Sequence, residues 1–526
     1  MSFSKGDASY QEFSSDSVTP LIRNGNEGKK VTYKDADVVL KFLEANQDET
    51  RTLSIEESDQ LDQKNFKIVI FLVSLVTLVL FMDKATIGYT VILGLYKDTG
   101  ITKSQFNNLN SIFYIGYLIA QWPGHILLQK LPIGKYLSFT ILTWAIIIFI
   151  TSFAQNYNQL AILRFLLGAS ESVVTPACEI TLGMFLDPKQ REFAQPIFWT
   201  STAIAPFISS FIAFGLLKTE DLFDISPWRI FMIINSVQSV VLSIIVWFWY
   251  PDNPINAKFL STIEKIHLIK KIQNLTKSST EQKTIKTYQI KETLKDPISW
   301  LFFGQSFTLM LSNSLHYQQN QLFVDIGVDY LGSSLVSAAG SIWSVLIYII
   351  FAIVIKKFPN QNGIIGIICL ILPITASIAM CIIPWEYKKA LLASMILAGS
   401  SKGVTYIVAL GWNTSSASGY TKKLYRNVMF MIAYAVANIL SPQLWDPKDS
   451  PRYIKSWVIQ IIFAFALNGV ILWIIRIILK QRNEERLHQI DDQDYFITND
   501  EGIEERVDVA MLDLTDWENK KFIYPL

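Results

Sequence analysis

The sequence is poor in charged residues and in the residues that build metal or catalytic centres. Only 17% of its 526 residues are Asp, Glu, Lys or Arg, whereas soluble domains carry about 25%. The net charge of +1 gives no support to nucleic-acid binding. The three cysteines, Cys178, Cys369 and Cys381, lie in apolar segments and have neither metal nor disulfide spacing. Paired His/Asp metal spacings and a Gly-x-Ser-x-Gly turn are also absent, so we expect no enzyme and no metal site.

What the sequence has instead is long apolar runs. Hydrophobic residues make up 51% of the chain, and an apolar window of about 20 residues is long enough to cross a bilayer as a helix. The windows lie near residues 66–96, 106–129, 135–154, 157–186, 192–217 and 228–250, and then near 297–320, 333–356, 362–384, 388–411, 424–445 and 456–480. We therefore predict an all-α membrane protein with twelve transmembrane helices in two six-helix bundles.

Polar segments divide the chain. Residues 1–63 have no apolar signal-peptide core and are rich in Ser, Asp, Glu and Asn, so we predict a disordered tail there. The bundles then cover 64–250 and 297–480, a loop covers 251–296, and a second tail covers 481–526. Lys and Arg favour the side of the tails, which the positive-inside rule assigns to the cytoplasm. Both termini and the central loop are therefore expected to be cytoplasmic.

The central loop has a possible helix of its own. Phe259, Ile263, Ile266 and Ile269 or Lys270 recur at helical spacing among lysines. This pattern is consistent with an amphipathic helix on the inner leaflet, or with a solvated linker.

The first predicted span contains two opposite charges, Asp83 and Lys84, inside the apolar run 68–96. A charge at the centre of a bilayer costs at least about 2.5–3.5 kcal/mol, so ionisable residues there mark ion or substrate pathways by default. The alternative is a coincidental pair near a helix end. Apolar sequence continues on both sides of the pair, which favours the functional interpretation.

The fourth span contributes a second charged group, Arg164 and Glu171. Seven residues are close to two helical turns, so these side chains share one face of the helix roughly 10 Å apart. An anion bound to a cation competes for the partner of a nearby carboxylate, which couples anion binding to proton uptake. We assign Lys84 and Arg164 to substrate binding and Asp83 and Glu171 to proton coupling, with Asp83–Arg164 as a pair that breaks and reforms. A static network of ion pairs is the alternative.

The second bundle has fewer charges. The segment LLGASESVVT at 166–175 aligns with ILAGSSKGVT at 396–405, and this internal repeat favours two related bundles with a path between them. Lys402 in the repeat, with Asn313 and His316 near the end of the seventh span, are further candidates for substrate binding. Close helix packing is the alternative role for Lys402, and simple hydration is the alternative for the other two.

Several motifs occur in order along the chain, among them MDKATIG at 82–88, FYIGYLIAQWPG at 113–124, LRFLLGASES at 163–172, PWRIFMI at 227–233 and YPDNP at 250–254. With these motifs the chain resembles the major facilitator superfamily, and within it the anion:cation symporter group of the fungal allantoate permease family. The resemblance implies that Asp83, Lys84, Arg164 and Glu171 take part in substrate and proton coupling. Many relatives have arginine where this chain has Lys84, so a point charge replaces a planar fork.

The residues and the resemblance together predict a proton-coupled symporter of a small organic anion, working by alternating access without a cofactor and driven by the proton gradient. Related permeases carry anions such as allantoate, nicotinate, pantothenate and biotin, and one is linked to the thiamine pathway. A uniporter or exchanger of the same solutes, or a nutrient sensor with little transport, are the alternatives. We expect a monomer in the lipid bilayer of the plasma membrane, or of an internal membrane such as the endoplasmic reticulum.

Overall fold

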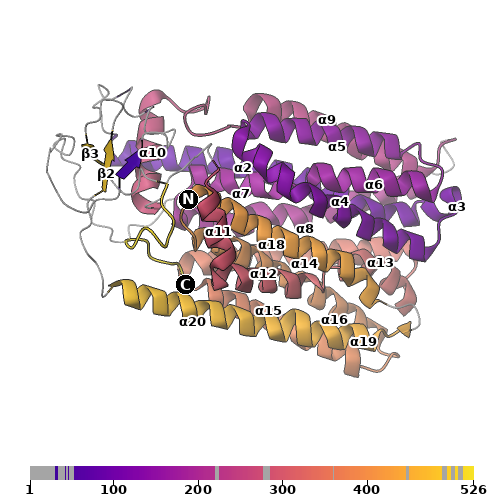
Figure 1. Cartoon of the computed structure of the whole chain (residues 1–526). Coiled ribbons are helices and arrows are strands. Elements are labelled where there is room, and N and C mark those ends of the chain that lie inside the picture. The colour runs from indigo at the N-terminus through magenta and orange to yellow at the C-terminus, as the bar shows by residue number, and fades with distance from the viewer. Residues whose placement is uncertain are drawn as a thin grey trace.

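The computed structural model is a bundle of long helices that lie side by side along one direction (Figure 1). It describes residues 30–32, 42, 46, 53–218, 224–276, 285–358, 360–445, 449–487, 495–498, 504–507 and 513–526. The helices of the first half of the chain form one group, and those of the second half form another beside it. The predicted architecture of two helical bundles is therefore confirmed.

The first bundle is built from α2 to α9. Its helices are α2 (Ile55–Ile92), the short α3 (Leu95–Thr99), α4 (Lys103–Lys130), α5 (Ile133–Thr151), α6 (Tyr157–Glu171), α7 (Val174–Phe185), α8 (Pro188–Lys218) and α9 (Pro227–Trp249). Local sequence sets their ends, as at α4, where Thr102 and Gln105 form a capping box. Within the bundle α2 packs against α8 and α9, α4 against α6, and α5 against α9.

The second bundle is built from α12 to α20. Its elements are α12 (Pro297–Met310), α13 (Leu315–Ile326), α14 (Tyr330–Lys357), α15 (Asn362–Ile382), α16 (Lys388–Ser400), α17 (Lys402–Ser415), α18 (Tyr420–Leu440), η3 (Ser441–Leu444), α19 (Ile454–Ile459), the π-helical η5 (Gln460–Ala466) and α20 (Leu467–Leu487). Asp296 caps α12 by accepting a hydrogen bond from the Ile298 N–H at 3.2 Å. The bundles meet where α4 packs on α18 and where α8 packs on α14 and α17.

Ten helical segments among the described residues are long and apolar enough to cross a membrane. They account for ten of the twelve predicted spans. The other two, 106–129 and 297–320, coincide with α4 and with the pair α12–α13. A turn at residues 311–314 leaves α12 with 14 residues and α13 with 12, and polar side chains lower the hydropathy of α4. For these two segments the membrane span stays a prediction.

Helical structure extends into the predicted N-terminal tail and the central loop. α2 begins at Ile55, inside the predicted tail, because Ser54 and Glu57 form a capping box; most of the tail before it lies outside the described residues. The predicted loop contains α10 (Thr262–Thr276) and α11 (Thr287–Lys295). The expectation that α10 lays its apolar face on the inner leaflet is wrong for Ile266 and Ile269, which are buried in contacts within the protein.

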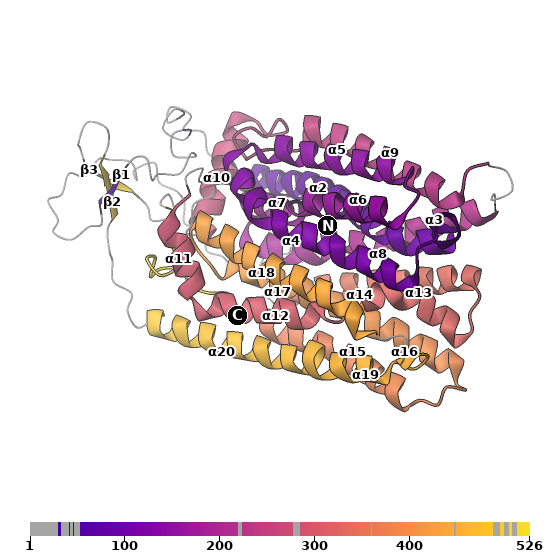
Figure 2. The ribbon, with the colours of Figure 1, turned by 45° about the vertical axis from the view of Figure 1, so that its right-hand side comes forward.

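The predicted C-terminal tail begins within α20, and its last part, residues 513–526, packs against the second bundle. Three short strands from the two tails form a small sheet: β1 (Lys30–Thr32) is parallel to β2 (Tyr495–Thr498), which is antiparallel to β3 (Glu504–Val507). We call the end of the molecule with α10, α11 and residues 513–526 the linker end, and the other the opposite end. Figure 2 shows the sheet beyond the helices of the linker end.

Candidate functional site

Glycine contacts hold α6, which carries two of the predicted charged residues, against α4. A Cβ on Gly168 of α6 would lie 1.9 Å from the carbonyl oxygen of Phe113. A Cβ on Gly116 of α4 would lie 2.0 Å from the carbonyl oxygen of Phe165. Two backbones can approach so closely only where both helices carry glycine. The contact brings Tyr117 of α4 to the charged face of α6.

Lys84 of α2 is surrounded by aromatic rings and one carboxylate. Its side chain is 8% exposed, and its Nζ lies 4.0 Å from Glu171 Oε2. The same Nζ lies 5.0 Å from the ring centre of Phe81, 5.6 Å from that of Tyr117 and 5.9 Å from that of Tyr434. Because Tyr434 belongs to α18, the ammonium lies where the two bundles meet. Cation–π attraction stabilises it without using its three hydrogen-bond donors.

Asp83 faces away from its neighbour. Successive residues of a helix point about 100° apart, and Asp83 faces α9, whose Ser239 donates a hydrogen bond to Oδ2 at 3.0 Å. Its other oxygen, Oδ1, has no hydrogen-bond donor among the described residues. Arg164 interacts electrostatically with both Asp83 and Glu171. The guanidinium therefore connects the two carboxylates of the first bundle.

Glu171 is the last residue of α6, at the break before α7. It is 1% exposed, and in the described part of the chain neither of its carboxylate oxygens has a hydrogen-bond donor. The carbonyl that the break exposes, that of Ser172, accepts a hydrogen bond from the side-chain amide of Gln121 at 3.1 Å. The structure thus brings together the four charged residues predicted in the first bundle.

The three candidates of the second bundle gather at the break between α12 and α13. The ammonium of Lys402 is buried and donates to the Ser312 carbonyl at 2.6 Å. Asn313 donates to Asn438 Oδ1 at 2.6 Å. His316 is exposed and lies within electrostatic range of Lys402. Because an ammonium has three donors and a side-chain amide two, Lys402 and Asn313 can keep these partners and still donate to a substrate.

Tyrosines connect the two groups, among them Tyr406 and Tyr434, which the sequence patterns did not single out. Their ring centres lie 5.8 Å apart, and the hydroxyls of Tyr434 and Tyr114 are 3.2 Å apart. Tyr406 also lies about one helical turn after Lys402 on α17. The available signal was a phenolic hydroxyl in an otherwise apolar span, where it needs a polar partner.

Comparison with known proteins assigns the chain to a family. A model of the Major Facilitator Superfamily matches residues 73–442. The chain belongs to this superfamily. The solved structure of the proton:xylose symporter XylE matches with a TM-score of 0.62 at 12% identity, covering 78% of this chain and 96% of that one. At this identity the match shows the fold alone.

Curated fungal transporters are similar over almost their whole length. The chain is 42% identical to the high affinity cysteine transporter of Saccharomyces cerevisiae, over 93% of this chain and 95% of that protein. It is 28% identical to a thiamine pathway transporter of the same yeast, over 94% of each chain. It is 27% identical to the yeast allantoate permease, over 99% of this chain and 96% of that protein. The predicted family and the non-enzymatic class are confirmed, and the protein is a multi-pass membrane transporter.

In this transporter, α4 and α18 form one seam between the bundles. Near the opposite end the Ser111 hydroxyl donates to the Ile439 carbonyl at 3.3 Å, and near the linker end the Gln129 amide donates to the Thr421 hydroxyl at 3.3 Å. The tyrosines beside Lys84 lie between these contacts. Along this seam the charged site is therefore flanked at both ends by contacts between the bundles.

Proposed function

We propose that this transporter is a proton-coupled symporter of a small organic anion. The observation that carries the proposal is the arrangement of Lys84 and Glu171, a cation and a carboxylate 4.0 Å apart where the two bundles meet. An ammonium with unused donors is a contact for a substrate carboxylate. A buried carboxylate without hydrogen-bond donors is destabilised in its charged form and is suited to accept a proton.

Charge balance couples the two ligands. In the empty site Lys84 and Glu171 neutralise each other. With both ligands bound, the anion neutralises Lys84 and the proton neutralises Glu171, so the site is balanced again. With one ligand alone a buried charge is left without a partner, which is unfavourable in a low-dielectric site. The empty and the fully loaded sites are therefore the ones that can be enclosed and carried across. Asp83 and Arg164 supply a second pair that adjusts to these changes.

We infer that the linker end faces the cytoplasm and that the transporter works as a monomer in the plasma membrane. Lys130, Lys356 and Lys422 lie at this end of their helices, in keeping with the positive-inside rule. With this orientation, protons and anion enter together from the opposite end. No cofactor takes part, because the proton gradient supplies the energy.

The similarity to a cysteine transporter makes amino acids the first substrates to test, although these carboxylate-bearing solutes are zwitterions and not net anions. The carboxylate of an amino acid would contact Lys84, and its ammonium would lie within reach of the electron-rich faces of Tyr117 and Tyr434. Allantoate is the second compound to test, since it offers a carboxylate without an ammonium.

Uptake of radiolabelled cysteine and allantoate at two external pH values tests the coupling. We expect faster accumulation at the lower pH and its collapse when a protonophore is added. Accumulation that ignores the proton gradient would contradict symport and favour the uniporter or exchanger. If neither compound is taken up, and no other small organic anion is taken up in a wider screen, the proposed substrate class is contradicted.

Glu171→Gln tests the proton site directly, because glutamine mimics the protonated carboxylate. We expect this variant to keep exchange of internal for external substrate and to lose accumulation against a gradient. Glu386→Gln is the matched control, because Glu386 is an exposed residue in the connection between α15 and α16. This variant should leave exchange and accumulation unchanged. Accumulation by the Glu171→Gln variant would remove Glu171 from the proposed coupling role.

A further inference from the structure

The last residues of the chain form a packed strap across the linker end. We call residues 513–526 the strap. Four of its polar side chains are buried, with Asp513 2%, Thr515 0%, Asp516 0% and Asn519 1% exposed. Buried polar groups persist only where they are paired. The partners of these buried groups therefore indicate which parts of the protein the strap stabilises.

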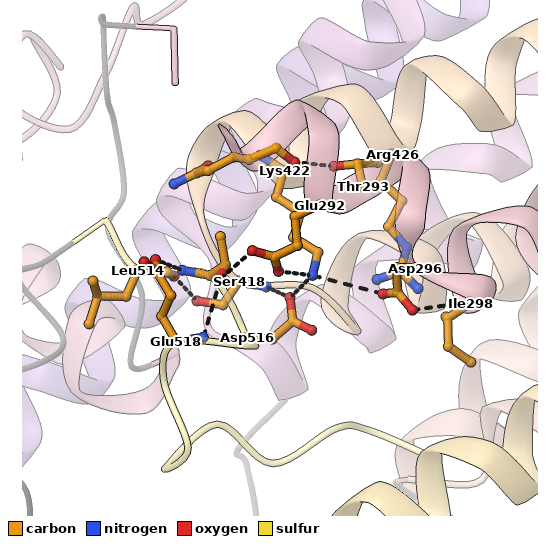
Figure 3. Close-up of polar contacts among 12 residues, drawn as sticks. Glu292, Thr293, Asp296, Ile298, Ser418, Lys422, Arg426, Leu514, Asp516 and Glu518 are labelled. Carbon is orange, nitrogen blue, oxygen red and sulfur yellow. Dashed lines mark hydrogen bonds and ion pairs between the residues drawn. The ribbon is translucent and has the colours of Figure 1, made fainter. Parts of the chain in front are cut away.

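The centre of the strap lies in a buried ion cluster around Lys422, which is fully buried at the start of α18. Its ammonium lies 2.8 Å from Asp516 of the strap, 2.5 Å from Glu292 of α11 and 3.8 Å from Asp296 at the start of α12. Figure 3 shows these carboxylates converging on the ammonium from three separate segments. Loss of the strap would remove one of the three and open the cluster to water.

The end of the strap is fixed to the second bundle. Arg486 of α20 donates to the Tyr524 hydroxyl at 2.8 Å, and Asn483 accepts from the Tyr524 N–H at 2.9 Å. Trp412 of α17 donates from its indole nitrogen to the Pro525 carbonyl at 2.7 Å. These anchors hold the strap in one register on the linker end.

The start of the strap holds the short connection between α17 and α18, residues 416–419. The Ser418 hydroxyl donates to the Leu514 carbonyl at 2.8 Å, and the Ser418 N–H donates to Asp516 at 3.3 Å. The Tyr420 N–H donates to Asp513 at 2.6 Å. Gly419 between them has φ of +86°, a conformation that glycine adopts without strain. The two strap carboxylates thus cap the turn that leads into α18.

Thr421, which follows Tyr420 on α18, takes part in the contact between the bundles. Thr421 accepts the hydrogen bond from Gln129 of α4 at 3.3 Å. Lys423 lies within electrostatic range of Arg191 of α8, in the first bundle, and of both strap carboxylates, Asp513 and Asp516. The strap therefore contacts residues of the second bundle that are adjacent in sequence to those facing the first bundle at the linker end.

We propose that Asp513 and Asp516 are positioning residues for closure of the transporter at its linker end. They fix the 416–419 turn so that Thr421 meets Gln129 when that end closes. The described contacts of the strap are with the second bundle and α11, so it moves with this half of the protein. The inference rests on the proposed alternating-access function. Without the strap, the turn relaxes and the equilibrium shifts toward the state that is open at the linker end, while Ser111–Ile439 at the opposite end is unaffected.

The accessibility of the closure contact tests this proposal. A reporter variant, Gln129→Cys, is labelled with a membrane-impermeant maleimide in sealed inside-out vesicles. It places a thiol where the bundles meet but gives up the hydrogen bond to Thr421, so its own labelling rate is the baseline for every comparison. Cys178 and Cys369 are buried, and Cys381 lies near the end of α15, at the opposite end of the molecule. Background labelling of these cysteines by a reagent that reaches only the linker end is therefore low. Adding Asp513→Ala and Asp516→Ala, which remove the oxygens that accept from the Tyr420 and Ser418 N–H groups, should raise the labelling rate by about fivefold or more, a change within the usual range of conformational coupling.

Asp449→Asn is the matched control, since it removes a carboxylate that pairs with Lys455 at 3.0 Å at the opposite end, and it should leave the labelling rate unchanged. Should the double variant be absent from the membrane, Ser418→Ala takes its place. It removes one hydroxyl contact with the strap, keeps the ion cluster, and should change labelling in the same direction.

Unchanged labelling in a variant that is folded and present at normal levels would show that the strap only braces the second bundle, and would overturn the proposal. The readout needs neither substrate nor a proton gradient, so it is independent of whether transport is proton-coupled. Increased labelling in right-side-out instead of inside-out vesicles would support the positioning role and overturn the proposed orientation.

Discussion

At the scale of single residues, the proposed anion contact can be tested at Lys84. Methionine at this position has a similar length and can keep the contacts with Phe81, Tyr117 and Tyr434, but it has no charge. A hydrogen bond to a charged group contributes about 1.5–3 kcal/mol, so the Lys84→Met variant should have a KM for the anion raised about 10- to 100-fold. Initial uptake rates over a range of substrate concentrations measure this change.

One further variant separates the charge of Lys84 from its shape, and a second serves as a control. Lys84→Arg keeps the charge and should retain transport, with an altered preference among carboxylates because guanidinium binds them as a planar fork. Lys97→Met removes an exposed lysine of α3 and should leave KM unchanged. A Lys84→Met variant with the normal KM would show that the anion binds elsewhere, with Lys402 and His316 as the next residues to test.

At the scale of helices, the α4–α6 contact fixes the geometry of the charged site. A methyl group on Gly168 would lie 1.9 Å from the Phe113 carbonyl oxygen, so Gly168→Ala must push the helices apart. Overpacking of this kind costs about 1–3 kcal/mol. We expect a lower thermal unfolding midpoint in detergent and a reduced transport rate, because Tyr117 moves away from Lys84 and Glu171.

Gly88→Ala is the control for this change. Gly88 lies on α2, and a Cβ there has no atom within 4 Å among those described. Since alanine favours helix by up to about 1 kcal/mol over glycine, this variant should be as stable as the original or more so. If the two alanine variants unfold at the same temperature, the close approach of α4 and α6 does not limit stability.

The helices also show which parts of the site sequence patterns could predict. Asp83, Lys84, Arg164 and Glu171 stood out because charges are rare inside apolar runs, and the structure brings them together. The break of α6 at Glu171 and the position of Tyr434 depend on contacts between distant segments, which periodicity within one helix does not contain. The strap was missed for a related reason. The sequence pattern assigns it, with the polar and charged residues before it, to one tail, and its partners lie on α11, α17, α18 and α20.

At the scale of the whole molecule, the linker end is held together by charges from distant parts of the sequence. Asp296 accepts a hydrogen bond from Arg482 of α20 at 2.9 Å and lies 3.8 Å from Lys422 of α18. Burial acts to raise the pKa of Asp296, but the cations Arg426, Arg482 and Lys422 outweigh it and hold the pKa below the ordinary value of 3.8. One carboxylate therefore neutralises cations of two helices and caps a third.

This arrangement predicts how stability depends on pH. A carboxylate whose pKa is lower in the folded than in the unfolded protein stabilises the fold fully above the unfolded value, and this contribution disappears as the pH falls through the folded value. Asp296→Asn keeps the cap of α12 but removes the carboxylate that pairs with Arg482 and one of the three around Lys422. Breaking a buried ion pair costs about 3–5 kcal/mol. Thermal unfolding in detergent from pH 7 to pH 3 should show a large loss of stability for the variant at pH 7, and this loss should narrow as the pH drops below 3.8.

Asp449→Asn, in a pair whose lysine is exposed, should cost about 0–1 kcal/mol at pH 7. A deficit for Asp296→Asn that is equally large at every pH would show that its cause is packing and not charge.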